Sequence, residues 1–183
     1  MSSTTDPATW VDAYGDRLYR YALSRVRDAV SAEDLLQDTF LAAFKSRDRF
    51  KAESSELTWM TGILRNKIFE LYRRQAKEVP LLPSDEDSDP ELEFFNGRHW
   101  SAPPRDWGGE PARSAESAEF SAALSSCLDA LSRNAARAFI LREMEGVEPR
   151  AAAEALGIAP NHLAVLLYRA RMRLRRCLER SFS

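Results

Sequence analysis

The first part of the chain, from Trp10 to Lys77, has apolar residues at helical spacing and contains no proline. Positions three and four apart along a helix lie on the same face, so this spacing gives each helix one apolar side. The earliest such set consists of Leu18, Tyr21, Ala22 and Val26. The pattern predicts helices throughout this part of the chain.

A second helix is predicted from Ser31 to Ser46. Ser31, followed three residues later by Asp34, resembles a capping box in which the acid is shortened from Glu. We expect this helix to turn its apolar side toward a core. The residues expected on that side are Leu35, Leu36, Phe40 and Phe44.

A third, longer helix is predicted after a polar turn, with Ser54 or Ser55 as its cap. It ends in a basic cluster, residues 72–77. We expect Trp59 to belong to its packed side rather than to serve as a platform for stacked bases. The other apolar positions are Leu57, Met60, Ile63, Leu64, Ile68 and Leu71.

The segment from Glu78 to about Glu116 has a different composition. Six of the nine prolines lie there, with three glycines and an acidic run at 85–87. Such a segment is typical of a linker. It also contains Phe94, Phe95, Trp100 and Trp107, which are too many aromatic residues for an idle spacer. We expect these rings to dock, either on the chain's own domains or on a partner.

The last part of the chain is predicted to be helical again. Ser132 can cap one helix, and Gly157 can end another as a residue with positive φ. The predicted helices cover Phe120–Leu131, 132–145, 149–156 and Pro160 to about Arg180. The fold class is therefore all-α, with two small helical domains, residues 8–77 and 117–181. A long acidic linker rich in Pro and Gly, residues 78–116, joins them, and no β-sheet is expected.

Charge divides the chain in the same way. Residues 8–77 carry a net charge of +3, residues 78–119 of −8 and residues 120–183 of +4. Weakly basic blocks suit a polyanionic partner. The start of the chain lacks the features of a secretory signal, and no apolar run is long enough to span a membrane, so we expect a cytoplasmic protein.

In that reducing compartment, Cys127 and Cys177 are expected to be buried free thiols, with a redox or metal role as the alternative.

Residues 149–176 have the form of a helix-turn-helix, with a short helix, a turn at Gly157-Ile158 and a longer second helix. Arginines gather in the second half of the longer helix, at Arg169, Arg171, Arg173, Arg175 and Arg176. Guanidinium groups at this density suit the neutralisation of phosphates. A solvated basic helix, or a surface for an acidic partner, is the alternative; the three-helix context favours DNA binding.

Two stretches of the chain resemble the extracytoplasmic-function (ECF) sigma factors of bacteria. The stretch from Ala32 to Arg74, with AEDLLQDTF, DRFKAESSELTWMTGILRN and LYRR, resembles sigma region 2. The stretch from Cys127 to Glu179, from CLDALSRNAARAFILREMEG to RARMRLRRCLE, resembles sigma region 4. Both stretches, in this order, are a stronger signal than either alone. The resemblance implies an alternative sigma factor, which is not an enzyme, needs no cofactor or metal, and guides RNA polymerase to promoters.

The resemblance also implies partners. They are promoter DNA, an anti-sigma factor and core RNA polymerase, contacted at the clamp helices of one large subunit and the flap of the other, without direct contact to a membrane. The linker sequence GRHWSAPPRDWG and the two cysteines resemble a subgroup paired with zinc-binding anti-sigma factors. In this family the linker threads through the polymerase, where Trp100 and Trp107 are then expected to dock.

For region 2, the resemblance implies that the second helix binds the clamp helices and that the following turn and helix melt and read the minus-ten element. Without this resemblance, the preferred interpretation of the polar side of the second helix would be a solvated acidic face. Unpaired bases are read by a pocket, stacking and edge hydrogen bonds. The core-binding candidates are Asp34, Gln37, Asp38 and Phe40. The minus-ten candidates, of which Asn66 and Lys67 are expected to lie away from the 34–38 face, are Phe50, Lys51, Glu53, Ser54, Ser55, Arg65, Asn66, Lys67, Arg73 and Arg74.

For region 4, the resemblance implies readout of the minus-thirty-five element by the helix-turn-helix. One departure is that many family members have basic and small polar residues where this chain has Ala164, Val165 and Leu166, which donate no side-chain hydrogen bond. Readout then depends on other residues or on DNA shape, or the exposed apolar patch binds a protein partner. The minus-thirty-five candidates are Arg150, Asn161, His162, Tyr168, Arg169 and Arg171.

Three other classes of protein fit the sequence less well. A pure adaptor would leave no footprint on DNA even with polymerase present. A classical helix-turn-helix regulator, with the first block as a sensing domain, would bind promoter DNA without polymerase and leaves the region 2 motifs unexplained. An enzyme has little support, because the chain has neither a glycine-rich phosphate loop nor an HExxH motif, and its only histidines are His99 and His162. A metal site formed by His99 with the cysteines stays open, although the spacing matches no standard zinc pattern.

Overall fold

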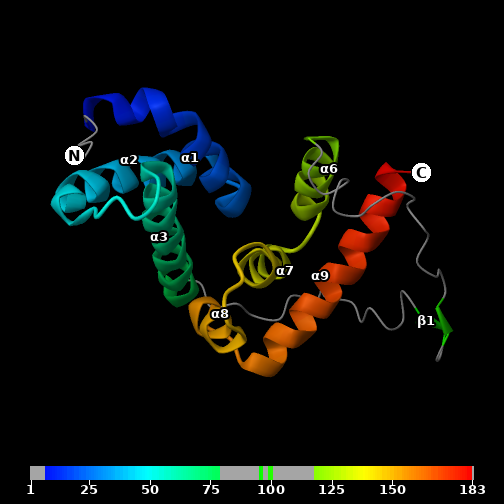
Figure 1. The fold of residues 1–183 in the computed structure, drawn as a ribbon. Helices are drawn as coiled ribbons and strands as arrows, with labels where there is room; N and C mark the ends of the chain where they lie inside the picture. Colours follow the sequence, from blue (N-terminus) through cyan, green and yellow to red (C-terminus); the bar gives the residue numbers. More distant parts are fainter. Residues whose placement is uncertain (1–6, 79–94, 97–98, 101–117, 183) are drawn as a thin grey trace. The chain divides into compact units, whose positions relative to one another are not determined.

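The computed structural model describes residues 7–78, 95–96, 99–100 and 118–182, and the chain divides into two compact units, 1–75 and 76–183 (Figure 1). The all-α fold class is confirmed. One departure is a two-residue antiparallel ladder between β1 (Phe95–Asn96) and β2 (His99–Trp100), where no sheet was expected. Trp107 and most of the linker lie outside the described residues, and only the backbone of Trp100 is described, so linker docking stays a prediction.

The N-terminal unit is built on α1 (Trp10–Val26), α2 (Ala29–Ser46) and α3 (Glu56–Glu78), with short 3-10 turns η1 (Pro7–Thr9) and η2 (Arg47–Arg49). The predicted apolar side of α3 is confirmed at Met60 and Leu64, which are both fully buried. Trp59 is half-buried and packs edge-on against the buried Trp10, with ring centroids 6.2 Å apart, so its assignment to the packed side is confirmed only in part.

Three side-chain hydrogen bonds tie α1 to α3. At the start of α3, Glu56 accepts hydrogen bonds from Trp10 Nε1 at 3.3 Å and from the Tyr14 hydroxyl at 3.0 Å. The bond to Glu56 raises the pKa of Tyr14 above 10.0, and burial and the negative charge of Glu56 add to the shift. Near the other end, the hydroxyl of the buried Tyr72 donates to the carbonyl of Arg25 at 2.7 Å. The two bonds to Glu56 hold the start of α3, where the preceding loop ends, against α1.

The start of α2 differs from the prediction. The helix begins at Ala29, and its cap is Asp28, whose carboxylate accepts a hydrogen bond from the Ser31 backbone N–H at 2.8 Å. This bonding lowers the pKa of Asp28 below 3.8. Asp28 has the extended backbone that a cap needs, with φ −140° and ψ 122°, whereas Ser31 already lies inside the helix. The expected capping box at Ser31 and Asp34 is therefore wrong.

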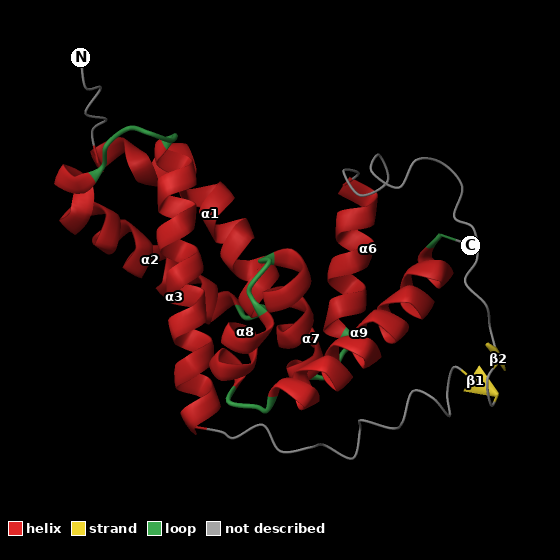
Figure 2. Ribbon diagram, turned by 60° about the horizontal axis from the view of Figure 1, so that its bottom comes forward, coloured by secondary structure: helices red, strands yellow, loops and turns green. Residues whose placement is uncertain are grey.

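The C-terminal unit contains α6 (Ala118–Asp129), α7 (Arg133–Phe139), a π-helical turn η3 (Ile140–Met144), α8 (Pro149–Leu156) and α9 (Pro160–Ser181). Ser132 caps α7 by accepting from the Ala135 N–H at 3.4 Å, as predicted. Gly157 ends α8 with φ +65°, a conformation that costs glycine least, and α9 starts after a short turn (Figure 2). The predicted helix-turn-helix is confirmed in its bounds.

The two cysteines do not form the expected pair of free thiols. Cys127 in α6 and Cys177 in α9 are joined by a disulfide, with their Cα atoms 5.7 Å apart. The bond lies in a cluster of apolar residues from α6, α7 and α9 that includes Leu128, Ala170 and Leu174. Because both sulfurs are used in this bond, the cysteines are not available as thiolate ligands, and the alternative of a metal site with His99 is not supported.

Within the described part of the chain, no helix is both long enough and apolar enough to cross a bilayer. Among the same residues, no group of three or more His, Cys, Asp or Glu side chains lies close enough together to hold a metal ion.

Candidate functional site

The outward side of α2 is the first candidate surface. Asp34, Gln37 and Asp38 are all exposed on it, as the predicted core-binding role requires, while Phe40 is half-buried. The buried side of the same helix carries small or medium residues, Ala32, Leu35, Thr39 and Ala43. The Thr39 hydroxyl is satisfied by donating to the Leu35 carbonyl at 2.6 Å.

Sequence reasoning missed three apolar residues on that outward side. Val30, Leu41 and Phe44 are 68%, 58% and 51% exposed, and Phe44 was expected in the core. At 100° per residue, Val30 and Leu41 lie within about 20° of each other around the helix, and Phe44 within about 40° of Val30. They form one stripe with Asp34 and Gln37, which we call the α2 stripe. Large exposed apolar side chains aligned on one helix face make this side of α2 a candidate interaction surface.

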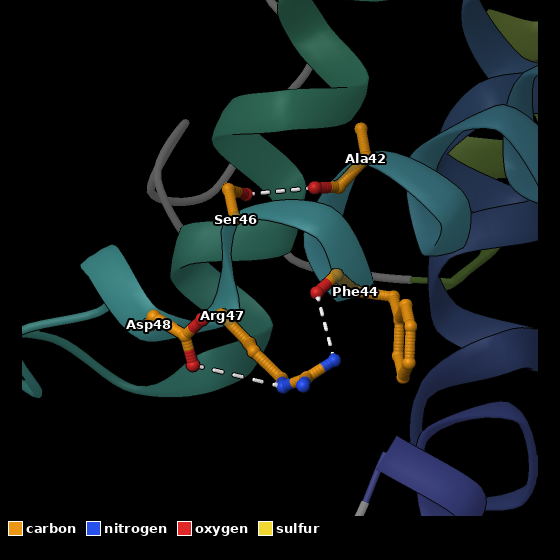
Figure 3. Close-up of polar contacts among 5 residues, drawn as sticks. All are labelled: Ala42, Phe44, Ser46, Arg47 and Asp48. Carbon is orange, nitrogen blue, oxygen red and sulfur yellow. Dashed lines mark hydrogen bonds and ion pairs between the residues drawn. The ribbon is translucent and has the colours of Figure 1, made fainter.

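The end of α2 leads into the second candidate surface (Figure 3). Arg47 lies over the Phe44 ring, with the guanidinium carbon 4.4 Å from the ring centre, donates to the Phe44 carbonyl at 3.4 Å and approaches the Asp48 carboxylate at 3.7 Å. Ser46 donates to the Ala42 carbonyl at 2.7 Å. These contacts close the last turn of α2 and set the direction in which the following loop leaves it.

The loop between η2 and α3 holds the first five minus-ten candidates. Lys51, Glu53, Ser54 and Ser55 are exposed, and Phe50 is half-buried with its ring 4.9 Å from that of Trp59. Ser55 caps α3 by accepting from the Thr58 N–H at 3.1 Å, which selects Ser55 over Ser54 as the predicted cap. Ala52 has φ +55°, a conformation that is uncommon for a residue with a Cβ and that costs backbone strain.

The other five minus-ten candidates follow along α3. Arg65, Asn66, Arg73 and Arg74 are exposed. Lys67 is different, because its ammonium group pairs with the Asp38 carboxylate of α2 at 3.5 Å. The expectation that Lys67 lies away from the 34–38 face is therefore wrong, and the same expectation for Asn66 stays a prediction.

The third candidate surface is the first half of α9. Asn161 and Tyr168 are exposed and His162 and Arg169 are half-exposed, while Arg150 is exposed at the start of α8. Arg171 is exposed, and its guanidinium pairs with Glu143 of η3 at 2.5 Å. This turn is also held by the Arg142 guanidinium, which donates to the Val147 carbonyl.

The predicted apolar patch on α9 is only partly present. Ala164 is exposed and Val165 is 44% exposed, but Leu166 is 1% exposed and belongs to the core. A helix of a helix-turn-helix packs on its own unit along one side, and Leu166 lies with Leu163 and Ala170 on that side. The patch therefore consists of Ala164 and Val165, extended by Tyr168, which is 37% exposed.

Comparison with known proteins matches the N-terminal and C-terminal helical parts of the chain to two separate family models. The family model for sigma-70 region 2 matches residues 10–78, and that for sigma-70 region 4 matches residues 121–174. A probable RNA polymerase sigma factor of Haemophilus influenzae is 33% identical over 167 residues, 90% of this chain and 85% of that protein. The ECF RNA polymerase sigma factor SigE of Mycolicibacterium smegmatis is 26% identical over 172 residues, 90% of this chain and 58% of that protein.

Among solved structures, the sigma factor RpoE of Bartonella quintana, in complex with the anti-sigma factor NepR, aligns with a TM-score of 0.44 at 26% identity, covering 94% of this chain and 96% of that one. The chain belongs to the sigma-70 family and is of its ECF type. It is an alternative sigma factor, which directs promoter recognition and transcription initiation by RNA polymerase.

Proposed function

We propose that this sigma factor divides its work among the three surfaces, with residues 8–77 as region 2, 78–116 as the linker and 117–181 as region 4. The observation that carries the proposal is the α2 stripe, which places apolar side chains outside a helix whose inner side is already packed. A helix face of this kind, which includes Asp34 and Gln37 and is flanked by Asp38, fits a groove or helix pair of a partner. We assign it to the clamp helices of core polymerase, together with the half-buried Phe40 of the same helix.

The loop 50–55 and the exposed side of α3 are assigned to the minus-ten element. The half-exposed Phe50 ring offers a face on which a flipped base can stack, and Asn66 offers a donor and an acceptor for a base edge. Arg65, Arg73 and Arg74 lie exposed for phosphates. Asn66→Ala is expected to abolish promoter opening, measured as permanganate reactivity of unpaired thymines, and to leave core affinity unchanged. Lost core affinity with normal opening would contradict this assignment.

Region 4 is assigned to duplex DNA at the minus-thirty-five element and to the flap of the polymerase. The helix-turn-helix supports this, since its second helix presents Asn161 and Tyr168 outward and carries a series of arginines beyond them. Arg171 would exchange its partner Glu143 for a phosphate when DNA binds.

We also propose control by an anti-sigma factor, as in the Bartonella quintana complex, and a cytoplasmic location, where core polymerase works. The likeness of the linker and cysteines to the subgroup with zinc-binding anti-sigma factors supports a partner of that kind. In this proposal the zinc belongs to the partner.

The proposal is tested with the full chain and core polymerase on genomic fragments in run-off transcription. Defined start sites that need both components are expected. A classical regulator would instead protect duplex promoter DNA without polymerase, and that result would overturn the function.

The α2 stripe is tested separately by the affinity for core polymerase. Val30→Ala with Leu41→Ala should weaken binding by about tenfold or more, because the two truncations together remove several apolar groups, each worth about 0.8 kcal/mol when buried, and about 1.4 kcal/mol is a factor of ten. Val11→Ala is the matched control, since Val11 is 59% exposed on α1 and lies outside the stripe. Equal affinities for the double variant and the unaltered chain would remove the stripe from the interface.

A further inference from the structure

The first half of α9 presents a mostly apolar face where a DNA-reading helix is expected to present hydrogen-bonding groups. Asn161, Ala164, Val165 and Tyr168 lie along one exposed side, at intervals of three and four residues. Opposite them, Leu163, Leu166 and Leu167 are buried. The helix cannot rotate to present other residues, because that would expose these leucines.

Charge and position indicate what covers this face. The helix continues beyond it into Arg169, Arg171 and Arg173, and α8 with the Gly157 turn completes the motif that seats a second helix in the major groove. A polyanion therefore fits this helix better than an apolar protein surface does.

The major groove offers an exposed valine one favourable partner. Base edges there present hydrogen-bond donors and acceptors, which Val165 and Ala164 cannot satisfy, and one apolar group, the C5-methyl of thymine. A cytosine or guanine edge in the same place would lose its hydrogen bonds to water and would gain none from the protein. Asn161, four residues earlier, has the paired donor and acceptor that suit adenine.

We propose that Val165 is a specificity-determining residue that reads a thymine methyl group in the minus-thirty-five element, with Ala164 and the Tyr168 ring closing the apolar contact. The inference rests on the proposed role of region 4 and adds the chemical group that is read. The upstream element of this sigma factor then contains a T·A pair that is required for its methyl and not for its hydrogen bonds.

The test replaces single thymines by deoxyuridine, which removes the methyl and keeps every hydrogen-bonding group. Promoters are first recovered by transcription from a duplex library with a randomised upstream element, using core polymerase and the full chain. Each thymine of the recovered element is then replaced, and initiation is measured in competition with the unaltered promoter. At one position initiation should fall by about fourfold, the value expected for one buried methyl group.

Val165→Ala should reduce the preference for thymine over deoxyuridine at that position to nearly one, because the partner of the methyl is gone. Val11→Ala, the same change at an exposed valine of the N-terminal unit, should keep the fourfold preference. If the preference persists in Val165→Ala, or if no thymine shows one, the inference is wrong and region 4 still reads DNA. If Val165→Ala loses anti-sigma binding but keeps the preference, the face belongs to a protein. A library that yields no promoter would refute the proposed function itself.

Discussion

Reduction of the disulfide should destabilise region 4 and leave region 2 unchanged. Cys127 and Cys177 are 50 residues apart in sequence, and the bond encloses α7, α8 and most of α9. A cross-link that closes a loop of this length stabilises the fold by about 4 kcal/mol in the chain-entropy model, through its restriction of the unfolded chain. Small domains have total stabilities of roughly 5–15 kcal/mol, so the bond supplies a large share.

The assay is hydrogen exchange of the full chain with and without dithiothreitol, read by mass spectrometry of peptides. Since about 1.4 kcal/mol is a factor of ten, the slowest amides of α6 and α9 should lose roughly a thousandfold of protection on reduction. Peptides of α1–α3 should exchange at the same rate in both conditions. The increase of two mass units verifies that the bond has been reduced.

The matched control is the chain with both Cys127→Ala and Cys177→Ala. Its exchange should resemble that of the reduced chain and should not respond to dithiothreitol. Equal protection of α6 in the oxidised and reduced chains would refute the reasoning, since the packing around Leu128 and Leu174 would then hold the unit without the covalent bond.

Three further predictions concern region 2. Tyr14→Phe should lower stability by about 1 kcal/mol at neutral pH. Because the folded-state pKa of Tyr14 is raised, this contribution is complete below pH 10 and is lost as pH rises through the folded pKa, so urea midpoints of the variant and the unaltered chain should converge there. Leu64→Ala, at a fully buried site, should cost about 2–5 kcal/mol in urea unfolding, whereas Leu41→Ala should stay within about 0.5. Ala52→Gly should raise the free energy of unfolding by up to about 1 kcal/mol, and the urea midpoint with it, because glycine accepts φ +55° without strain; a lower midpoint would contradict this.

The elements with local signals were predicted well from sequence. The bounds of α8 and the start of α9 follow from Pro149, Gly157 and Pro160, whose effects on the backbone depend on few neighbours. The start of α2 was missed because Asp28, Ser31 and Asp34 are all acceptable near a helix start, and only backbone geometry identifies the cap.

The candidate site was predicted in its residue types and less well in its contacts. Pairing of Lys67 with Asp38, and of Cys127 with Cys177, depends on helices that meet only in the folded unit. The disulfide also differs from the expected pair of free thiols, which was inferred from a reducing compartment. Burial of Leu166 beside exposed Val165 depends on which side of α9 packs, and a run of apolar residues does not indicate this.

The contact between Phe50 and Trp59 gives the protein an optical reporter at its proposed site of DNA melting. Indole emission responds to aromatic neighbours and to water within a few ångströms, and the Phe50 ring centroid lies 4.9 Å from that of Trp59. A base that stacks on Phe50 would shift or quench this emission as the promoter opens. Trp59→Phe would identify the signal, since the other tryptophans remain, and stopped-flow mixing with promoter DNA would then time strand separation without an attached dye.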